Sequence, residues 1–237
     1  MQHICLISGV TRGLGFHLAK VYRQAGFHVV GLARDREKLA AMQKAGILAD
    51  FLVCDLGSPS ALDTAIQEME TRYSRLDVLI HNAAIQNTAD IAGKGDYAGL
   101  IHREMQVNFL SPVKLTSAWL PLLAQAQGRV IVISSLLQLG PKRAAPGYCA
   151  SKAALSNWVQ NLRVQLQELK IGVTEVVPGL IRTEMTEQAA QKAVPPEQLA
   201  PLIYSNAHRD LIILPGARLA WRVHRFFPDL IKAKLLA

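Results

Sequence analysis

Short apolar segments alternate with longer segments of helical character along almost the whole chain. We expect strands at residues 4–7, 28–32, 50–54, 78–80, 129–134, 173–177 and 211–214. We expect helices at residues 16–24, 36–45, 58–72, 96–119 and 148–170. Strands separated by helices require right-handed crossovers, which produce a parallel sheet. The alternation therefore predicts an α/β fold, a doubly wound parallel sheet with helices on both faces.

The fifth strand segment and the long helix before it add detail to this prediction. The run Val130-Ile131-Val132-Ile133 is β-branched throughout, which is typical of a strand buried on both faces. The helix at 96–119 carries Asn108, and we expect Pro112 to kink or break it. Ligands bind at the carboxyl ends of the strands in such sheets, so we expect the functional residues there.

The composition favours one intracellular domain. The chain has 237 residues, half of them apolar, and no linker or internal repeat divides it, so we expect a single domain over 1–237. Its three cysteines and its histidines, including His17 and His81, lack metal-ligand spacing, and we expect no metal site. No segment reads as a signal peptide or has the roughly 18 apolar residues of a membrane span. We therefore expect a soluble, cytoplasmic protein.

The formal net charge is +8, but its distribution does not favour a nucleic-acid partner. Basic residues are concentrated after Arg209, so much of the excess belongs to the C-terminal tail. Net charge alone is weak support for nucleic-acid binding, and we expect no specific nucleic-acid partner.

A glycine-rich turn joins the first predicted strand to the first predicted helix. Its sequence is Ser8-Gly9-Val10-Thr11-Arg12-Gly13-Leu14-Gly15. Glycines let the backbone turn tightly and approach a pyrophosphate, which the N–H groups at the start of the helix then bind. At this place in the chain such a turn indicates dinucleotide binding.

Tyr148 and Lys152 lie one helical turn apart and so share a helix face. We expect the ammonium group to favour the phenolate and to lower the Tyr148 pKa from about 10 toward neutrality. Such a phenol can donate and accept a proton in catalysis. Ser134 and Ser135 both follow the fifth strand segment, and we expect one of them to be structural.

In this order the motifs resemble the short-chain dehydrogenase/reductase family, over about residues 3–185. The resemblance implies a Rossmann-like fold and an oxidoreductase. It rests on the glycine turn, Asp55, Asn82-Ala83-Ala84, Asn108, Ser135, the Tyr148/Lys152 pair and Pro178-Gly179. Two positions depart from the family pattern. Ser8 replaces a threonine but keeps its hydroxyl, and His81-Asn82-Ala83-Ala84 replaces Asn-Asn-Ala-Gly.

The resemblance implies a role for each of four catalytic residues. Tyr148 would donate the proton, Lys152 would lower its pKa and hold the nicotinamide ribose, and Ser135 would bind the substrate oxygen. Asn108 would anchor a water molecule that relays protons through Lys152. The alternative for Asn108 is a polar side chain that satisfies a kinked helix near Pro112.

The charges after the second strand favour NADPH over NADH. Enzymes that use NAD usually place an acid at the end of this strand, where the chain has Ala33 followed by Arg34. Arg12 and Arg34 together would bind a 2′-phosphate. The alternatives are that both arginines are solvated, or that the strand ends two residues later and Asp35 is the NAD acid.

The complete set of expected cofactor contacts follows the carboxyl edge of the sheet. It consists of Gly9, Thr11, Arg12, Gly13, Leu14, Gly15, Arg34, Asp55, Leu56, Asn82, Ala83, Tyr148, Lys152, Pro178, Gly179, Ile181 and Thr183. By the resemblance, Asp55 would cap the adenine and Asn82 would contact a ribose. The alternatives are a helix-capping aspartate and a turn residue.

Two segments of the C-terminal part of the chain are expected to be a lid and an extension. We expect residues 186–206 to form a mobile substrate lid and residues 215–237 to form a basic amphipathic extension broken at Pro228. That extension either packs on its own domain or a second subunit, or makes a peripheral contact with an anionic membrane.

The sequence supports two hypotheses about function. The first is an NADPH-dependent reductase of a small or lipophilic carbonyl compound, working as a homodimer or homotetramer. The second is an NADPH-binding sensor or scaffold without turnover. The intact set of Asn108, Ser135, Tyr148 and Lys152 favours the first.

Overall fold

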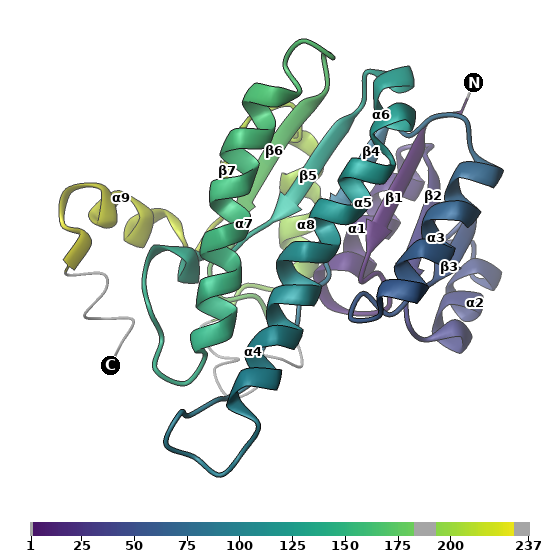
Figure 1. Cartoon of the computed structure of the whole chain (residues 1–237). Helices are drawn as coiled ribbons and strands as arrows, with labels where there is room; N and C mark the ends of the chain where they lie inside the picture. Colours follow the sequence, from purple (N-terminus) through teal and green to yellow (C-terminus); the bar gives the residue numbers. More distant parts are fainter. Residues whose placement is uncertain (1, 183–192, 230–237) are drawn as a thin grey trace.

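All seven strands lie in one parallel sheet. The computed structural model describes residues 2–182 and 193–229 of the chain (Figure 1). Within them the strand order is β3-β2-β1-β4-β5-β6-β7. The strands are β1 (Ile4–Ser8), β2 (His28–Ala33), β3 (Asp50–Val53), β4 (Val78–His81), β5 (Arg129–Ile133), β6 (Gly172–Val177) and β7 (Leu211–Ile213). The order reverses next to β1, as the prediction of a doubly wound sheet requires.

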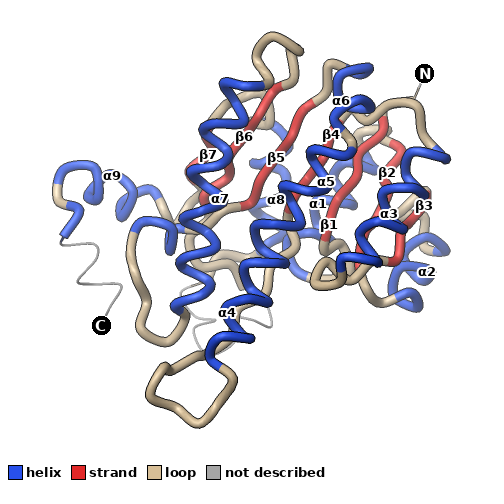
Figure 2. Tube along the Cα trace, in the orientation of Figure 1, coloured by secondary structure: helices blue, strands red, loops and turns tan. Residues whose placement is uncertain are grey.

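Helices cover both faces of this sheet (Figure 2). One face carries α1 (Gly13–Gln24), α2 (Arg36–Lys44) and α8 (Pro196–Ser205). The other carries α3 (Pro59–Arg72), α4 (Tyr97–Met105), α5 (Ser111–Ala118), α6 (Leu120–Ala126) and α7 (Pro146–Gln165). The remaining helix, α9 (Arg218–Phe226), projects from the body of the molecule (Figure 1).

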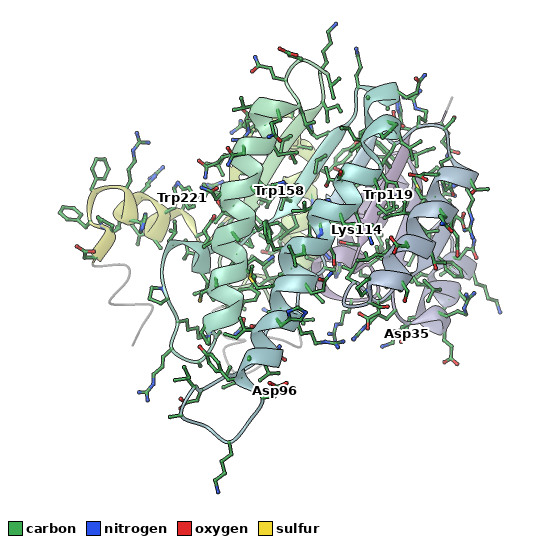
Figure 3. All side chains as sticks on the ribbon, viewed as in Figure 1. Asp35, Asp96, Lys114, Trp119, Trp158 and Trp221 are labelled. Atoms are coloured by element: carbon green, nitrogen blue, oxygen red, sulfur yellow. The ribbon has the colours of Figure 1, made fainter. Side chains whose placement is uncertain are left out.

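The strands divide the core into two layers because successive side chains point to opposite faces. In β1, Cys5 and Ile7 face α1, whereas Ile4 and Leu6 face the layer of α3 and α7. Trp119, between α5 and α6, is fully buried in the second layer (Figure 3). Burial on both faces explains why the predicted strands read as continuous apolar runs.

The long helix predicted at 96–119 is present, with a wide turn inside it. A π-helix, η1 (Gln106–Leu110), joins α4 to α5 and contains Asn108. In this turn the Ser111 N–H donates to the Gln106 carbonyl, five residues back. Pro112 has no N–H to donate, so the regular ladder is lost near it, as expected. The short helix α6 was not predicted.

The predicted lid at 186–206 falls partly outside the described residues. Its end is the regular helix α8, which packs on α1. Leu199, Ala200 and Ile203 of this helix are buried in the core. We therefore restrict the predicted lid to residues before Pro196.

The helix predicted at 148–170 begins two residues earlier and ends at Gln165. Pro146 starts it, which is the position in a helix where proline fits best.

In the part of the chain that the structure describes, no helix combines the length and the apolar character needed to cross a membrane.

Candidate active site

The candidate residues come together at the carboxyl edge of the sheet. The glycine turn follows β1, Asn82 follows β4, Ser135 follows β5 and Pro178 follows β6. These four strands are consecutive neighbours in the sheet, so segments far apart in the sequence meet along one edge.

The glycine turn adopts a conformation that side chains would obstruct. Gly9 and Gly13 have φ values of +70° and +54°, in the left-handed region. An added Cβ at Gly15 would overlap the Gly9 carbonyl oxygen and lie 2.6 Å from Asn82 Nδ2. The glycines therefore permit the close packing of the turn against the end of β4.

Ser8 and Asn82 lock this turn to β4. The Ser8 hydroxyl accepts hydrogen bonds from the N–H groups of Asn82 (3.0 Å) and Ala83 (3.1 Å). The Asn82 side-chain amide donates to the carbonyl oxygens of Ser8 (2.9 Å) and Gly9 (3.1 Å). Asn82 thus has the turn role that we gave as the alternative, and Ser8 supplies the hydroxyl that we expected it to keep.

The geometry of the turn suits a pyrophosphate. Thr11 is half-buried, Arg12 is exposed at the N-cap of α1, and Gly13, Leu14 and Gly15 form the first turn of the helix. The first N–H groups of a helix have no partner within it, and they carry the positive end of the helix dipole. Because no side chain projects from the glycines, a phosphate group can approach these N–H groups.

The second strand ends at the residue that the prediction of NADPH binding assumed. Strand β2 ends at Ala33, and Arg34 follows with an exposed side chain. Asp35 is the N-cap of α2, where its carboxylate accepts from the Lys38 N–H at 3.0 Å (Figure 3 shows its position). The strand therefore does not extend to Asp35, and this carboxylate already has a structural partner.

Asp55 and Leu56 follow β3 at the same edge. The Asp55 carboxylate accepts from the Gly57 N–H at 2.9 Å and pairs with Arg103 at 3.5 Å. Ser58, not Asp55, is the N-cap of α3. The helix-capping alternative for Asp55 is therefore wrong. Leu56 is buried, and its carbonyl accepts from the Ser111 hydroxyl at 2.6 Å.

The segment after β6 forms the far wall of the site. Pro178 is buried, and its carbonyl accepts from the Leu136 N–H at 3.2 Å. An added Cβ at Gly179 would lie 2.6 Å from the carbonyl carbon of Gly216. Ile181 forms a short parallel bridge with Val194. Thr183 lies outside the described residues.

The Asn108 side chain ties the loop after β4 to α7. Its Oδ1 accepts from the Ile85 N–H, and its Nδ2 donates to the Ile85 carbonyl, both at 2.9 Å. Nδ2 also donates to the Ser151 hydroxyl at 3.0 Å. Asn108 is fully buried in the π-helix, a kind of turn that is frequent at functional sites. These contacts go to the loop after β4 and to α7, and so differ from the alternative that we gave, in which Asn108 satisfies the kinked helix near Pro112.

The two serines after β5 have different partners. The Ser134 hydroxyl donates to the Val176 carbonyl at 3.0 Å and so joins β5 to β6. The Ser135 hydroxyl accepts from the Leu137 N–H at 3.1 Å, at the start of the 3₁₀ helix η2 (Leu136–Leu139). The Ser135 hydroxyl also acts on the Tyr148 phenol, whose pKa it lowers. Ser134 thus has the structural role that we expected of one of the two serines, and Ser135 is the one that acts on Tyr148.

Tyr148 and Lys152 face the same edge from the first turns of α7. Lys152 is almost fully buried, and its ammonium group donates to the Ile133 carbonyl at 2.8 Å. The ammonium nitrogen lies 5.7 Å from the centroid of the Tyr148 ring. The pair is thus arranged on one helix face beside Ser135, as the spacing predicts.

The Tyr148 pKa is shifted in the direction opposite to the one that we predicted. Burial raises the pKa of Tyr148 to about 12; the Ser135 hydrogen bond lowers it, and Cys149 and Glu104 raise it further. Burial also lowers the pKa of Lys152 to about 8, and Glu175 acts in the opposite direction. Desolvation is the largest cause of the Tyr148 shift and outweighs the attraction to Lys152 that we expected.

Two buried carboxyl groups near this pair were not predicted. Glu104 is buried against Gly147, and its Oε1 accepts from the Asn87 N–H at 2.5 Å. Glu175 is buried on β6. Among the described residues, Oε2 of Glu104 and Oε1 of Glu175 have no hydrogen-bond partner. The only signal for Glu104 was its place one turn before Asn108.

His81, where the family pattern has asparagine, is a core residue. Its Nε2 lies 2.7 Å from the Thr116 hydroxyl. Burial, followed by the positive charge of Lys152, lowers the pKa of His81 to about 3. The imidazole is therefore neutral at physiological pH and forms part of the support beneath the site.

Comparison with known proteins places these features in a family. The model of the short chain dehydrogenase family matches residues 3–193. The chain is 32% identical to the fatty acyl-CoA reductase of Acinetobacter baylyi, over 96% of this chain and 81% of that protein. It is 29% identical to the dehydrogenase/reductase SDR family protein 7-like of Drosophila melanogaster, over 96% of this chain and 77% of the relative.

Solved structures have the same fold. A short chain dehydrogenase from Burkholderia cenocepacia in complex with NADP superposes with a TM-score of 0.86 and 21% identity, covering 100% of both chains. The Pseudomonas aeruginosa RhlG/NADP active-site complex superposes with a TM-score of 0.80 and 26% identity, covering 90% of this chain and 95% of the other. With the family model and the 32% identical relative, these likenesses show that the chain is an oxidoreductase of the short-chain dehydrogenase/reductase family.

Proposed function

We propose that the chain is an NADPH-dependent reductase that converts an aldehyde or ketone into an alcohol, with Tyr148 as the general acid. The observation that carries this proposal is the arrangement around the Tyr148 phenol. Ser135 acts on this phenol and lowers its pKa, and Lys152 lies one turn away with its ammonium group donating to the Ile133 carbonyl. The glycine turn lies along the same edge of the sheet.

Bound NADPH supplies a hydride to the carbonyl carbon. As the carbonyl oxygen gains negative charge, it needs a hydrogen-bond donor and then a proton. Ser135 donates the hydrogen bond and Tyr148 the proton. The raised Tyr148 pKa keeps this phenol protonated at neutral pH, which suits reduction.

Lys152 and Asn108 support Tyr148 after the proton has left. The Lys152 ammonium group stabilises the phenolate that remains, because an opposite charge nearby favours the ionised form. Lys152 also holds the nicotinamide ribose. Asn108 fixes the first turns of α7 through Ser151, whose hydroxyl donates to the Tyr148 carbonyl at 2.8 Å. The water relay anchored by Asn108 is part of the same proposal.

The preference for NADPH rests on Arg12 and Arg34. The end of β2 at Ala33 and the capping role of Asp35 support it, because they leave no free acid beside Arg34 for a ribose hydroxyl. Two neighbours in the structural comparison were solved with NADP, which agrees with this preference. By analogy with the family, Asp55 and Leu56 contact the adenine, and Pro178, Gly179, Ile181 and Thr183 contact the nicotinamide.

We further propose a small or lipophilic carbonyl substrate. The relative named fatty acyl-CoA reductase acts, by its name, on an acyl group whose carbonyl is reduced. Reduction of a carbonyl in a lipophilic compound is the part of that chemistry that we carry over to this chain.

The expected partners are a second copy and a membrane surface. Val164 of α7 is 72% exposed and Leu110 of η1 is 43% exposed, and these apolar side chains suit contacts in a homodimer or homotetramer. Static light scattering of the purified chain tests this. For α9, we propose a peripheral membrane contact.

One assay tests the proposed function. NADPH oxidation is followed over aldehydes, ketones and 3-oxoacyl compounds, with and without the Tyr148→Phe substitution. Turnover that depends on Tyr148 supports the reductase. A chain that binds NADPH tightly but turns over none of these compounds is instead a sensor or scaffold.

A further inference from the structure

Helix α9 exposes an apolar stripe to solvent. Leu219 is 77% exposed, Phe226 73% and Phe227 65%. Every residue of α9 is described, and none of them is buried. The helix projects from the body of the molecule (Figures 1 and 2). These three side chains therefore do not pack on the domain, which was one of the two alternatives for this segment.

The same helix is basic. Its sequence, Arg-Leu-Ala-Trp-Arg-Val-His-Arg-Phe, has no acidic residue. The guanidinium groups of Arg218, Arg222 and Arg225 are on exposed residues. Arg218 Nε donates to the Ile213 carbonyl at 3.2 Å, which fixes the start of the helix on β7. Apolar and cationic side chains thus share one exposed helix.

The arginines beside the apolar stripe of α9 disfavour a second copy of the chain as the partner that covers this stripe. In a two-fold dimer the same patch meets itself, so the arginines of both copies would come close to each other. The cores of such interfaces are also depleted of charged residues. An anionic lipid surface avoids both problems, because its headgroups neutralise the arginines and its acyl region takes up the aromatic rings.

We propose that α9 is a docking helix for an anionic membrane surface. Leu219, Val223, Phe226 and Phe227 enter the interface between headgroups and acyl chains. Arg222 and Arg225 bind lipid phosphates or carboxylates at the level of the headgroups. The formal net charge of +8 adds a general attraction to such a surface.

Docking through α9 brings the candidate active site close to the bilayer. Gly216, two residues before α9, packs on Gly179 in the wall of the site. Helix α9 also contacts η2, which follows Ser135 directly. Trp221 lies where α9 meets the rest of the chain (Figure 3). The helix is about 14 Å long at 1.5 Å per residue, so its free end lies roughly this far from its start, which follows Gly216.

This placement predicts where the substrate comes from, and it rests on the proposed function. A carbonyl compound dissolved in the bilayer reaches the site without crossing water. We infer that the substrate is a long-chain, membrane-borne aldehyde or ketone.

Vesicle binding tests the docking without any need for turnover. The full chain is sedimented with vesicles of phosphatidylcholine alone and of phosphatidylcholine mixed with phosphatidylserine. We expect binding only to the mixed vesicles. Each arginine near an anionic surface contributes roughly fivefold, so Arg222→Glu with Arg225→Glu should weaken binding by at least about 25-fold.

A matched control has the same change of charge on the other side of the molecule. Lys20→Glu with Lys44→Glu changes exposed residues of α1 and α2 and should retain most of the binding. Phe226→Ser with Phe227→Ser removes the aromatic rings and should weaken binding without unfolding the chain, because both rings are exposed.

Several results would overturn the docking proposal. The proposal fails if the wild type does not bind the mixed vesicles, or if the α9 and control variants lose binding equally. A dimer in solution that the two serine substitutions dissociate, with no vesicle binding, would assign the stripe to a second copy instead.

Activity then tests the origin of the substrate. The Arg222→Glu, Arg225→Glu variant should lose the rate on a long-chain aldehyde held in mixed vesicles and keep the rate on a short water-soluble aldehyde. Equal rates for wild type and variant on both aldehydes would overturn the inference about the substrate. Vesicle binding without turnover of any carbonyl compound would refute the proposed function and leave the docking intact.

Discussion

The glycine turn and the start of α7 border the same edge of the sheet, but different interactions hold them. Neutral hydrogen bonds that Asn82 donates to Ser8, together with close contact at Gly15, hold the turn. Around Tyr148 the contacts include buried charges. Lys152 is buried beside it, and Glu104 keeps one carboxyl oxygen without a partner among the described residues.

The two regions should therefore respond to different changes. Contact repulsion rises steeply over a few tenths of an ångström, so the turn is sensitive to added atoms. Charges act over several ångströms in a buried setting, so Tyr148 is sensitive to charge even where no contact changes. Substitutions in the turn should alter stability and cofactor affinity, and those near Tyr148 should alter rate and pH dependence.

The largest effect should follow Tyr148→Phe. The loss of a general acid costs about 10²–10⁴-fold in rate, whereas the ring and its packing are kept. NADPH affinity should stay nearly unchanged. Steady-state kinetics and fluorescence titration with NADPH measure both, with Tyr204→Phe as the control. Turnover close to that of the wild type would exclude Tyr148 as the acid and remove the contrast between the two regions.

At the cofactor end, Arg34→Ala should weaken NADPH binding by about 10–100-fold, as expected for the loss of a charge-assisted hydrogen bond to phosphate. NADH binding should change little, because NADH has no 2′-phosphate. Lys44→Ala, at the other end of α2, is the control. Equal losses for both cofactors would mean that Arg34 does not contact the 2′-phosphate.

Gly15→Ala should destabilise the fold by about 1–3 kcal/mol, the usual cost of overpacking. The added methyl group would overlap the Gly9 carbonyl oxygen, which belongs to the backbone, and would crowd Asn82 Nδ2, which is held by its own hydrogen bonds. Alanine favours helices by up to about 1 kcal/mol over glycine, so a loss of stability isolates the steric contact. Urea unfolding measures it, with Gly95→Ala as the control in open space. Unchanged stability of the Gly15→Ala variant would show that the backbone of the turn can shift to accommodate the added methyl group.

The fold was largely predictable from the sequence. Its strands are buried on both faces and read as continuous apolar runs, whereas its helices are buried on one face and read as mixed segments. The run from Val130 to Ile133 identified a central strand. The first helix was found, but it begins at Gly13, inside the glycine turn, and not at residue 16 as predicted. The predictions that were wrong concern elements whose structure depends on contacts between residues far apart in the sequence. Helix α8 was assigned to a lid because nothing in its own sequence shows that Leu199 and Ile203 pack on α1.

The candidate site was predictable in position but not in its electrostatics. A glycine in a turn acts through the local backbone, so its place in the sequence predicts its geometry. The Tyr148 pKa depends on desolvation and on Glu104, which is far from it in the sequence. The spacing of Tyr148 and Lys152 gave their shared face correctly but predicted the wrong sign for the pKa shift.

The smallest effect should follow Glu104→Gln, which removes one buried charge and keeps the shape. The Glu104 charge raises the Tyr148 pKa, so its removal should lower that pKa. Reduction needs the protonated phenol and should then decline at a lower pH than in the wild type. Oxidation of the alcohol needs the phenolate and should begin at a lower pH. The rate of reduction at neutral pH should change little, because the phenol is protonated in both proteins.

Rates measured in both directions across the alkaline range separate this electrostatic role from a structural one. Glutamine still accepts from the Asn87 N–H, so the support of the loop is preserved. A structural defect would lower both rates at every pH, whereas a change in the Tyr148 pKa moves both profiles to lower pH without lowering their plateaus. Glu68→Gln, an exposed carboxylate paired with Arg72, should move neither profile. If Glu104→Gln also moves neither, the charge of Glu104 does not reach Tyr148, and the start of α7 differs from the glycine turn less than its buried carboxyl groups suggest.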